Sequence, residues 1–208
     1  MFVFIAISIG AFVKGLDNEV NANIIHYFKK DVKLRKDGEF IINNFGGTAG
    51  PELIIDSGIA DGIKDPEFLR KTEEYQEWIS SLPEVSKVIS VVDIIKQMNR
   101  AFHKGDQKHY TIANSKKRNA ELLFLYTMSL PQGMDLKNRM NLDGSQIRLS
   151  VLSTSMESKV MVKLIDKIIA KGKSLGLNLY ATGKFNLWQR VNSHVVSTFK
   201  ESLITALL

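Results

Sequence analysis

The chain contains no cysteine and only four histidines and four prolines among its 208 residues. Without cysteine it has no disulfide, no thiolate catalysis and no cysteine-ligated zinc or iron–sulfur site. A cysteine-free chain fits either side of a membrane, so this absence does not fix the compartment. Hydrophobic residues make up 44% and charged residues 24%, as in ordinary globular proteins. A chain of this length buries a sizeable core, as one domain or as two small ones.

The net charge of +6 is spread along the chain rather than gathered in one stripe. Aromatic residues do not alternate with basic ones as they do in RNA-binding modules. The last basic group has the spacing of the solvated side of a helix: Lys163, Lys167, Lys171 and Lys173. We therefore expect no nucleic-acid partner, and an anionic membrane surface nearby is the milder interpretation of the same charge.

Both ends of the sequence are apolar. Residues 2–13 carry no charge up to Lys14, and the chain finishes on SLITALL. Twelve helical residues span about 18 Å, less than the roughly 30 Å of a bilayer core. A basic region and a cleavage site of the signal-peptide kind are not evident. The two ends favour a domain cut from a membrane protein between two spans; the alternative is a pair of amphipathic terminal helices docked on the core.

The central stretch, residues 51–102, predicts a strand, a helix, a second strand and a second helix. PELIIDS at 51–57 is the first strand, and Asp65 is placed to cap a helix that begins at Pro66 and ends before Pro83. A β-branched run from Val85 to Val92 predicts the second strand, and Asp93 is placed to cap the helix that follows.

The same order returns in the second half of the chain. Asp143-Gly144 predicts a turn before a strand near 145–153, and a helix is expected over 115–130. The remaining expected elements are a helix over 157–175, a strand over 177–182 and a helix from there to the end. Residues 16–39 look like a polar surface connector, followed by a short element at 40–42 that the glycines at 46–47 end.

Two strand–helix–strand halves predict an α+β fold of the ferredoxin-like, split βαβ type. In this fold a four-stranded sheet carries two helices on one face. The helices after the second strand of each half, and the apolar terminal stubs, are additions to it.

The sequence does not predict an enzyme, a cofactor or a metal site. Glu73, Glu74 and Glu77 fall on the solvated side of a predicted helix, without a second polar group for acid–base work. A metal site at His103 and His109 is conceivable, with Asp106 between them. Their spacing, however, suits neither one helix face nor one side of a strand pair, so ordinary loop histidines are expected.

Several stretches together resemble the large extracytoplasmic loop of RND-superfamily exporters, in the MMPL/hopanoid-exporter-like branch. They are NNFGGT at 43–48, ELIIDSG at 52–58, DGIKDPEFL at 61–69, LPEVSKVISVVDIIKQMN at 82–99 and ATGKFNLWQRVN at 181–192. The run at 195–208 is similar to the start of the second transmembrane helix, and residues 2–12 to the tail of the first. No single motif is decisive; the resemblance lies in the ordered set, over nearly the whole chain.

The resemblance implies a porter domain between transmembrane helices 1 and 2 of a proton-driven exporter in the cell membrane. Residues 1–15 would be the tail of transmembrane helix 1 or an apolar N-terminal helix. Residues 16–194 would form the extracytoplasmic domain, with βαβ halves at about 47–102 and 145–194 and a helical insert at about 115–130. Residues 195–208 would begin transmembrane helix 2.

The implied partners are a second porter domain and the transmembrane helices of the same transporter, with hydrophobic or lipid-like cargo. The proton-relay carboxylates of such transporters lie in helices that this chain does not contain, so no catalytic residue carries over and the domain alone would not transport. Candidate contacts with cargo or with the partner domain lie on one very apolar predicted helix: Leu122, Leu123, Phe124, Tyr126 and Met128. Their alternative role is core packing. The alternative function is a free-standing ferredoxin-like ligand-binding or regulatory module.

Overall fold

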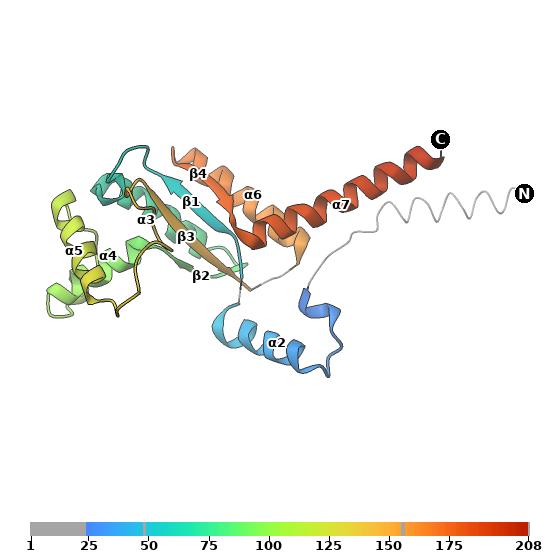
Figure 1. Ribbon diagram of the computed structural model, residues 1–208, viewed down its shortest axis with the longest axis horizontal. Coiled ribbons are helices and arrows are strands. Elements are labelled where there is room, and N and C mark those ends of the chain that lie inside the picture. Colours follow the sequence, from blue (N-terminus) through green and yellow to red (C-terminus); the bar gives the residue numbers. More distant parts are fainter. Residues whose placement is uncertain (1–23, 48, 155–156, 208) are drawn as a thin grey trace, which may run out of the picture.

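The computed structural model describes residues 24–47, 49–154 and 157–207. A four-stranded sheet lies at its centre, with helices around it (Figure 1). The elements before the first strand are η1 (Ile24–Tyr27) and α2 (Lys33–Phe45). The first half comprises β1 (Glu52–Asp56), η2 (Gly62–Lys64), α3 (Pro66–Ser80), β2 (Val85–Ile89) and α4 (Val91–Phe102). The second half comprises η3 (Gln107–His109), α5 (Lys116–Ser129), β3 (Gln146–Ser153), α6 (Ser158–Ser174), β4 (Asn178–Thr182) and α7 (Gly183–Leu207).

The strand order β2-β3-β1-β4 confirms the predicted fold. β1 lies between β3 and β4, and both pairs are antiparallel: Leu53 is opposite Leu149 of β3 and Ala181 of β4. β2 pairs antiparallel with the outer side of β3, where the register shifts between Val85 and Lys87. Each βαβ half therefore places its two strands parallel with a strand of the other half between them, which is the split βαβ arrangement.

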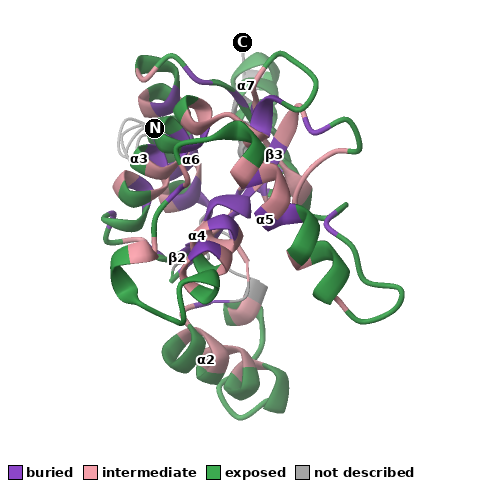
Figure 2. Cartoon of the chain, turned by 90° about the vertical axis from the view of Figure 1, so that its left-hand side faces the viewer, coloured by how far each residue is buried: buried purple, intermediate pink, exposed green. Residues whose placement is uncertain are grey.

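One face of the sheet is buried beneath α3 and α6. Leu53, Ile55 and Leu149 point to this face and are fully buried, because successive side chains of a strand point to opposite faces. The hydroxyl of Tyr75 on α3 donates a 2.7 Å hydrogen bond to the backbone oxygen of Ile168 on α6, and burial raises the pKa of this hydroxyl well above its ordinary value. Figure 2 shows the buried residues gathered in the middle of the molecule. The core thus lies between the sheet and these two helices, and it extends to buried residues of α4 and α5.

The opposite face of the sheet is polar and partly exposed. Arg148 on β3 donates hydrogen bonds of 2.7 and 2.9 Å to the two carboxylate oxygens of Glu52 on β1, and this bonding raises the pKa of Arg148 above its usual range. Ser150 donates a 2.7 Å hydrogen bond to the same carboxylate. A bidentate pair of this kind has a fixed geometry, so it favours the observed register of the two central strands.

The predicted boundary between β2 and α4 was wrong. Val91 and Val92 belong to the helix, and Ser90, rather than Asp93, is its N-cap. The Ser90 hydroxyl accepts a hydrogen bond from the Val92 backbone N–H, and the Asp93 carboxylate accepts one from the Ser90 backbone N–H. This capping box satisfies free N–H groups of the first turn. It outweighs the preference of the two β-branched valines for a strand.

The prediction of a surface connector and a short element before β1 was also wrong in part. A helix, α2, runs from Lys33 through Phe45. Arg35 and Glu39 form an i,i+4 ion pair at 2.8 Å within it, and Gly46 ends it in the left-handed conformation at φ 80°. The connector residues 16–23 and the predicted apolar stub at 1–15 lie outside the described residues.

The glycines after α2 bring the chain close to the sheet. Gly47 has φ 113°, and a Cβ atom there would lie 2.0 Å from the backbone oxygen of Ser153. Both its conformation and this close approach therefore require glycine. From this point the chain runs beside β3, where the Ser153 backbone N–H donates to the oxygen of Ala49 at 3.2 Å.

Three helices outside the split βαβ core extend from the body in different directions. In Figure 1, α5 is at the left end, α7 extends to the C-terminus on the right, and α2 lies below, apart from the sheet. Among the described residues, no helix combines the length and apolar character that crossing a membrane requires.

We expect Tyr75→Phe to lower the free energy of unfolding by about 1 kcal/mol, because it removes one buried hydrogen bond between α3 and α6. Urea unfolding followed by circular dichroism measures this difference. The matched control is Tyr180→Phe on the exposed side of β4, which should change stability by less than about 0.5 kcal/mol. Equal effects of the two variants would contradict the structural role of the Tyr75 hydroxyl.

Candidate functional site

The five candidate residues of α5 do not form one surface. Leu122 and Leu123 are buried in the core, at 0% and 3% exposure. Phe124 and Met128 lie on the other side of the helix, at 64% and 69% exposure. Tyr126 is half-buried on the same side as the two leucines. Core packing therefore accounts for Leu122 and Leu123, and the remaining three residues face two different environments.

A buried asparagine anchors α5 to the body. Asn119 is fully buried, and its side-chain amide donates to the backbone oxygens of Lys64 at 3.1 Å and Ala113 at 3.2 Å. Its side-chain oxygen accepts from the Ala113 backbone N–H at 3.2 Å. The Ser115 hydroxyl caps the helix by accepting from the Arg118 N–H. These bonds set the rotation of α5 and thereby direct its later turns toward α4.

A hollow of about 670 Å³ lies where the end of α5 meets α4 and the loop 131–139. Its volume falls within the range of small-molecule sites. The apolar part of its lining comes from three segments: Ile94 of α4, Tyr126 and Leu130 at the end of α5, and Met134 and Leu136 of the loop. Of the five candidate residues, Tyr126 lines this hollow.

Charged residues of the same loop border the hollow. The Lys137 ammonium lies 2.9 Å from the carboxylate of Asp135, and this hydrogen bond, with a further one from the Lys137 backbone N–H, lowers the pKa of Asp135 below its ordinary value. Arg139 lies at the edge of the hollow. Its backbone oxygen accepts a 2.8 Å hydrogen bond from the Arg148 N–H of β3, which fixes the loop to the sheet. The hollow thus combines an apolar wall with a polar border, an arrangement suited to an amphipathic molecule.

Sequence reasoning missed most of this lining. From the sequence, Leu130-Pro131-Gln132-Gly133 predicts only the end of a helix. The available signal was the apolar pair Met134 and Leu136 in an otherwise polar loop, but nothing in the sequence indicated that this loop would return to α4.

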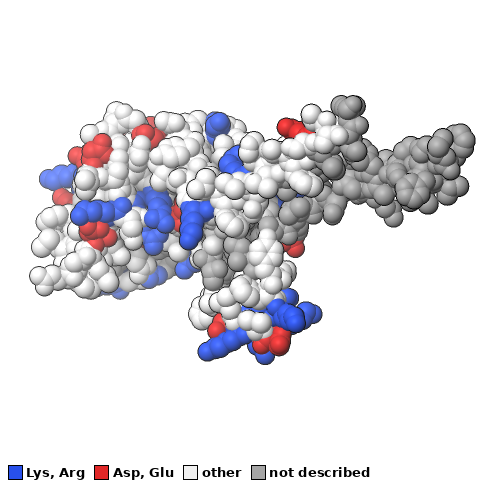
Figure 3. Space-filling model, turned by 45° about the vertical axis from the view of Figure 1, so that its right-hand side comes forward, with Lys and Arg blue, Asp and Glu red and all other residues white. Residues whose placement is uncertain are grey.

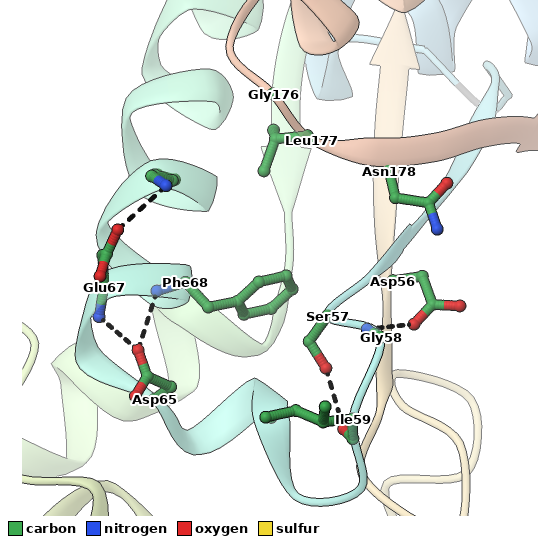
Figure 4. A pocket seen from close by; sticks show the side chains of 12 residues that line it. Asp56, Ser57, Gly58, Ile59, Asp65, Glu67, Phe68, Gly176, Leu177 and Asn178 are labelled. Atoms are coloured by element: carbon green, nitrogen blue, oxygen red, sulfur yellow. Dashed lines mark hydrogen bonds and ion pairs between the residues drawn. The ribbon is translucent and has the colours of Figure 1, made fainter.

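A second, smaller hollow of about 350 Å³ lies at the end of β1 (Figure 4). The acidic side chains there serve local structure. Asp56 accepts from the Gly58 N–H at 2.7 Å, Asp65 caps α3 by accepting from the Glu67 N–H at 2.9 Å, and Glu67 pairs with Lys71 at 3.0 Å. These carboxylates hold the turn into α3, which was predicted from Asp65, and none of them lies free beside a nucleophile.

The structure brings His103 and His109 together by stacking their rings. The ring centroids are 3.6 Å apart and the planes differ by 8°. His103 Nδ1–H donates to the backbone oxygen of Asn99 at 2.8 Å. Over the ranges that the structure describes, no group of three histidine or acidic side chains is placed to hold a metal ion.

The first turns of α7 face the body with Phe185 and two buried polar residues, Asn186 and Gln189, while several apolar side chains face outward. Leu187, Val191 and Val195 recur every fourth residue and are exposed, while Gln189 is buried. The side-chain oxygen of Gln189 and the side-chain nitrogen of Asn192 have no hydrogen-bond partner within the described part of the chain. α7 therefore exposes apolar side chains of the kind that an ordinary surface helix turns toward the core.

A comparison with models of known protein families finds no match to this chain, and no curated protein is detectably similar to it.

We expect Leu122→Ala to destabilise the protein by about 2–5 kcal/mol, because it leaves a cavity in the core. Met128→Ala, on the outer side of the same helix, should cost less than about 0.5 kcal/mol. Chemical denaturation of both variants measures the contrast. A small effect at Leu122 would contradict its assignment to the core and would return it to the candidate surface residues.

Proposed function

We propose that the chain is an extracytoplasmic porter domain of a proton-driven RND-type exporter of hydrophobic or lipid-like cargo. The observation that carries the proposal is the ordered set of family-like stretches along the sequence. Most of these stretches coincide with elements of the split βαβ core: 52–58 with β1, 61–69 with the start of α3, and 82–99 with β2 and α4. The domain would act only as part of the whole transporter.

The orientation of α7 supports the proposal. This helix leaves the sheet with an exposed apolar side and extends away from α5, toward the C-terminus (Figure 1). Val195 and Phe199 continue the stripe that begins at Leu187. Exposed apolar stripes of this kind are costly in water and mark contacts with other proteins or with lipid. If α7 continued into a bilayer beside other transmembrane helices, both lipid and protein would cover this apolar stripe.

The hollow beside α5 supports the cargo part of the proposal. Burial of an acyl chain against Ile94, Leu130 and Leu136 would yield about 25 cal/mol per Å² of apolar area. The polar border with Arg139 would remain in contact with water or with a polar headgroup. The exposed residues Phe124 and Met128, on the other side of α5, are better suited to contact with the second porter domain.

The reading frame on both sides of these 208 codons tests the proposal directly. We expect it to encode further apolar spans, each of about 20 residues, before and after this segment. A frame that encodes an exported protein without membrane spans would favour the alternative, a free-standing ferredoxin-like binding module.

Binding of a fluorescent fatty-acyl probe tests the hollow. We expect the double variant Ile94→Glu with Leu130→Glu to weaken probe binding about tenfold or more, equivalent to about 1.4 kcal/mol or more, because buried carboxylates would replace apolar wall. Phe124→Glu with Met128→Glu adds the same charge on the outer side of α5 and should leave binding unchanged. Mass spectrometry of co-purified lipid provides a second readout. Equal binding by both double variants would contradict a cargo contact in the hollow. It would not bear on the porter architecture, which the reading frame tests.

A further inference from the structure

The border of the hollow beside α5 carries one basic side chain without a counter-charge. Three charged residues of the loop 131–139 lie at this border: Asp135, Lys137 and Arg139. The Lys137 ammonium lies 2.9 Å from the Asp135 carboxylate, so these two charges neutralise each other. Arg139 is half-buried, and its guanidinium forms no hydrogen bond or ion pair with any residue that the structure describes. The border therefore keeps one unbalanced positive charge.

The acidic groups of the adjoining strands and turn already have partners. The Glu52 carboxylate accepts hydrogen bonds of 2.7 and 2.9 Å from Arg148. Asp143, in the turn before β3, accepts from the backbone N–H of Ser145 at 3.2 Å and from its hydroxyl at 2.9 Å. Because these carboxylates are engaged, the guanidinium of Arg139 is available to a bound anion.

The backbone around Arg139 is held in place before any ligand binds. Its N–H donates to the oxygen of Leu136 at 2.7 Å, and its oxygen accepts from the N–H of Arg148 at 2.8 Å. The next residue, Met140, forms an isolated bridge with Ile147 of β3. The loop does not have to become ordered when a ligand enters, and this lowers the entropic cost of binding.

Charge on the rest of the surface is mixed in sign. Figure 3 shows Lys and Arg side chains among Asp and Glu side chains, both on the body and on the lobe below it, which is α2. A broad basic surface would attract anions over a wide area. A preference for anions at the hollow would instead come from Arg139 itself.

The apolar wall of the hollow faces the same space as this border. It is formed by Ile94 of α4, Tyr126 and Leu130 of α5, and Leu136 of the loop. The volume of about 670 Å³ is that of a pocket for one small ligand. A guanidinium pairs with a carboxylate through two parallel N–H bonds. The wall and Arg139 together are thus complementary to an alkyl chain that ends in a carboxylate.

We propose that the hollow beside α5 binds single-chain amphiphiles with an anionic headgroup, of the fatty-acid type. The alkyl chain lies against Ile94, Tyr126 and Leu130, and the carboxylate accepts hydrogen bonds from Arg139. The inference rests on the proposed function in taking this hollow as the site of an amphipathic ligand, and it adds the charge of the headgroup. It does not require transport.

Three ligands of equal chain length test the headgroup: decanoate, decanol and decylammonium. Isothermal titration calorimetry with the full chain, below the micelle concentration of each ligand, measures the three affinities. Equal chains keep the apolar contribution the same. We expect decanoate to bind about tenfold or more tightly than decanol, because it alone forms charge-assisted hydrogen bonds with a guanidinium. Decylammonium should bind most weakly.

Replacement of the unpaired arginine tests its role. Arg139→Gln should lower the affinity for decanoate to that for decanol and leave decanol binding unchanged. The matched control is Arg118→Gln, which removes the same charge from the first turn of α5, at the end of the helix away from the hollow. This control should change none of the three affinities.

Replacement of the acidic residue at the border should act in the opposite direction. Asp135→Asn removes a negative charge and frees the Lys137 ammonium, so it should raise the affinity for decanoate several-fold and leave decanol unchanged. The asparagine oxygen can still accept the bond that the Lys137 backbone N–H donates at 3.0 Å, and the loop keeps its turn. A gain in affinity cannot result from unfolding, so this variant complements Arg139→Gln.

Each contrary result has a distinct meaning. Equal affinities for decanoate and decanol, or a preference that survives Arg139→Gln, would overturn the inference and leave the hollow as a cargo site. Tightest binding of decylammonium would contradict it and assign the border to Asp135. Uptake that none of the variants changes would place binding elsewhere on the chain. Absence of binding of all three ligands would contradict both the inference and the cargo part of the proposed function, whereas the porter architecture is tested by the reading frame.

Discussion

The structure depends on the burial of one face of β1 and β3, the two central strands. Leu53 and Ile55 of β1 lie on that face together with Leu149 of β3. A slip of one residue in the register would turn the apolar side chains of the slipped strand toward the polar side. The bond network of Arg148 and Glu52 on the opposite face favours the same register. Because β1 pairs on both sides, its position determines where every other strand lies and where the connections emerge.

The positions of the hollow beside α5 and of α2 are determined by the chain segments that run along the edges of this sheet. β2 covers only the second part of β3, and the first part is reached by the loop 131–141, where Met140 forms an isolated bridge with Ile147. That loop is therefore held against the body and forms one wall of the hollow beside α5. After α2 the chain reaches the sheet at Gly47. Because this residue has no side chain, the backbone can pass close to β3. The helix itself remains outside the core and contributes no buried residue to it.

The sequence predicted the strands and the main helices because their signals are local. Alternation predicted β3, and Asp65 before Pro66 predicted the start of α3. α2 was missed because it buries no residue, so its apolar pattern has no counterpart in the core, and Gly38 further weakens the helical signal. The start of α4 was misplaced because Val91 and Val92 suit a strand, while the decisive capping box involves bonds between side chain and backbone. The hollow was not predictable, since it depends on a loop that docks across a long separation in sequence.

The central claim is that this sheet-and-helix domain lies outside the cytoplasm as part of a membrane transporter. The most direct measurement is the labelling of a single cysteine at the exposed position Lys163 of α6, in the complete protein expressed in cells. A membrane-impermeant maleimide should label it without lysis, and the labelled protein should sediment with the membrane fraction. Labelling only after lysis, or recovery of the labelled protein in the soluble fraction, would contradict the account.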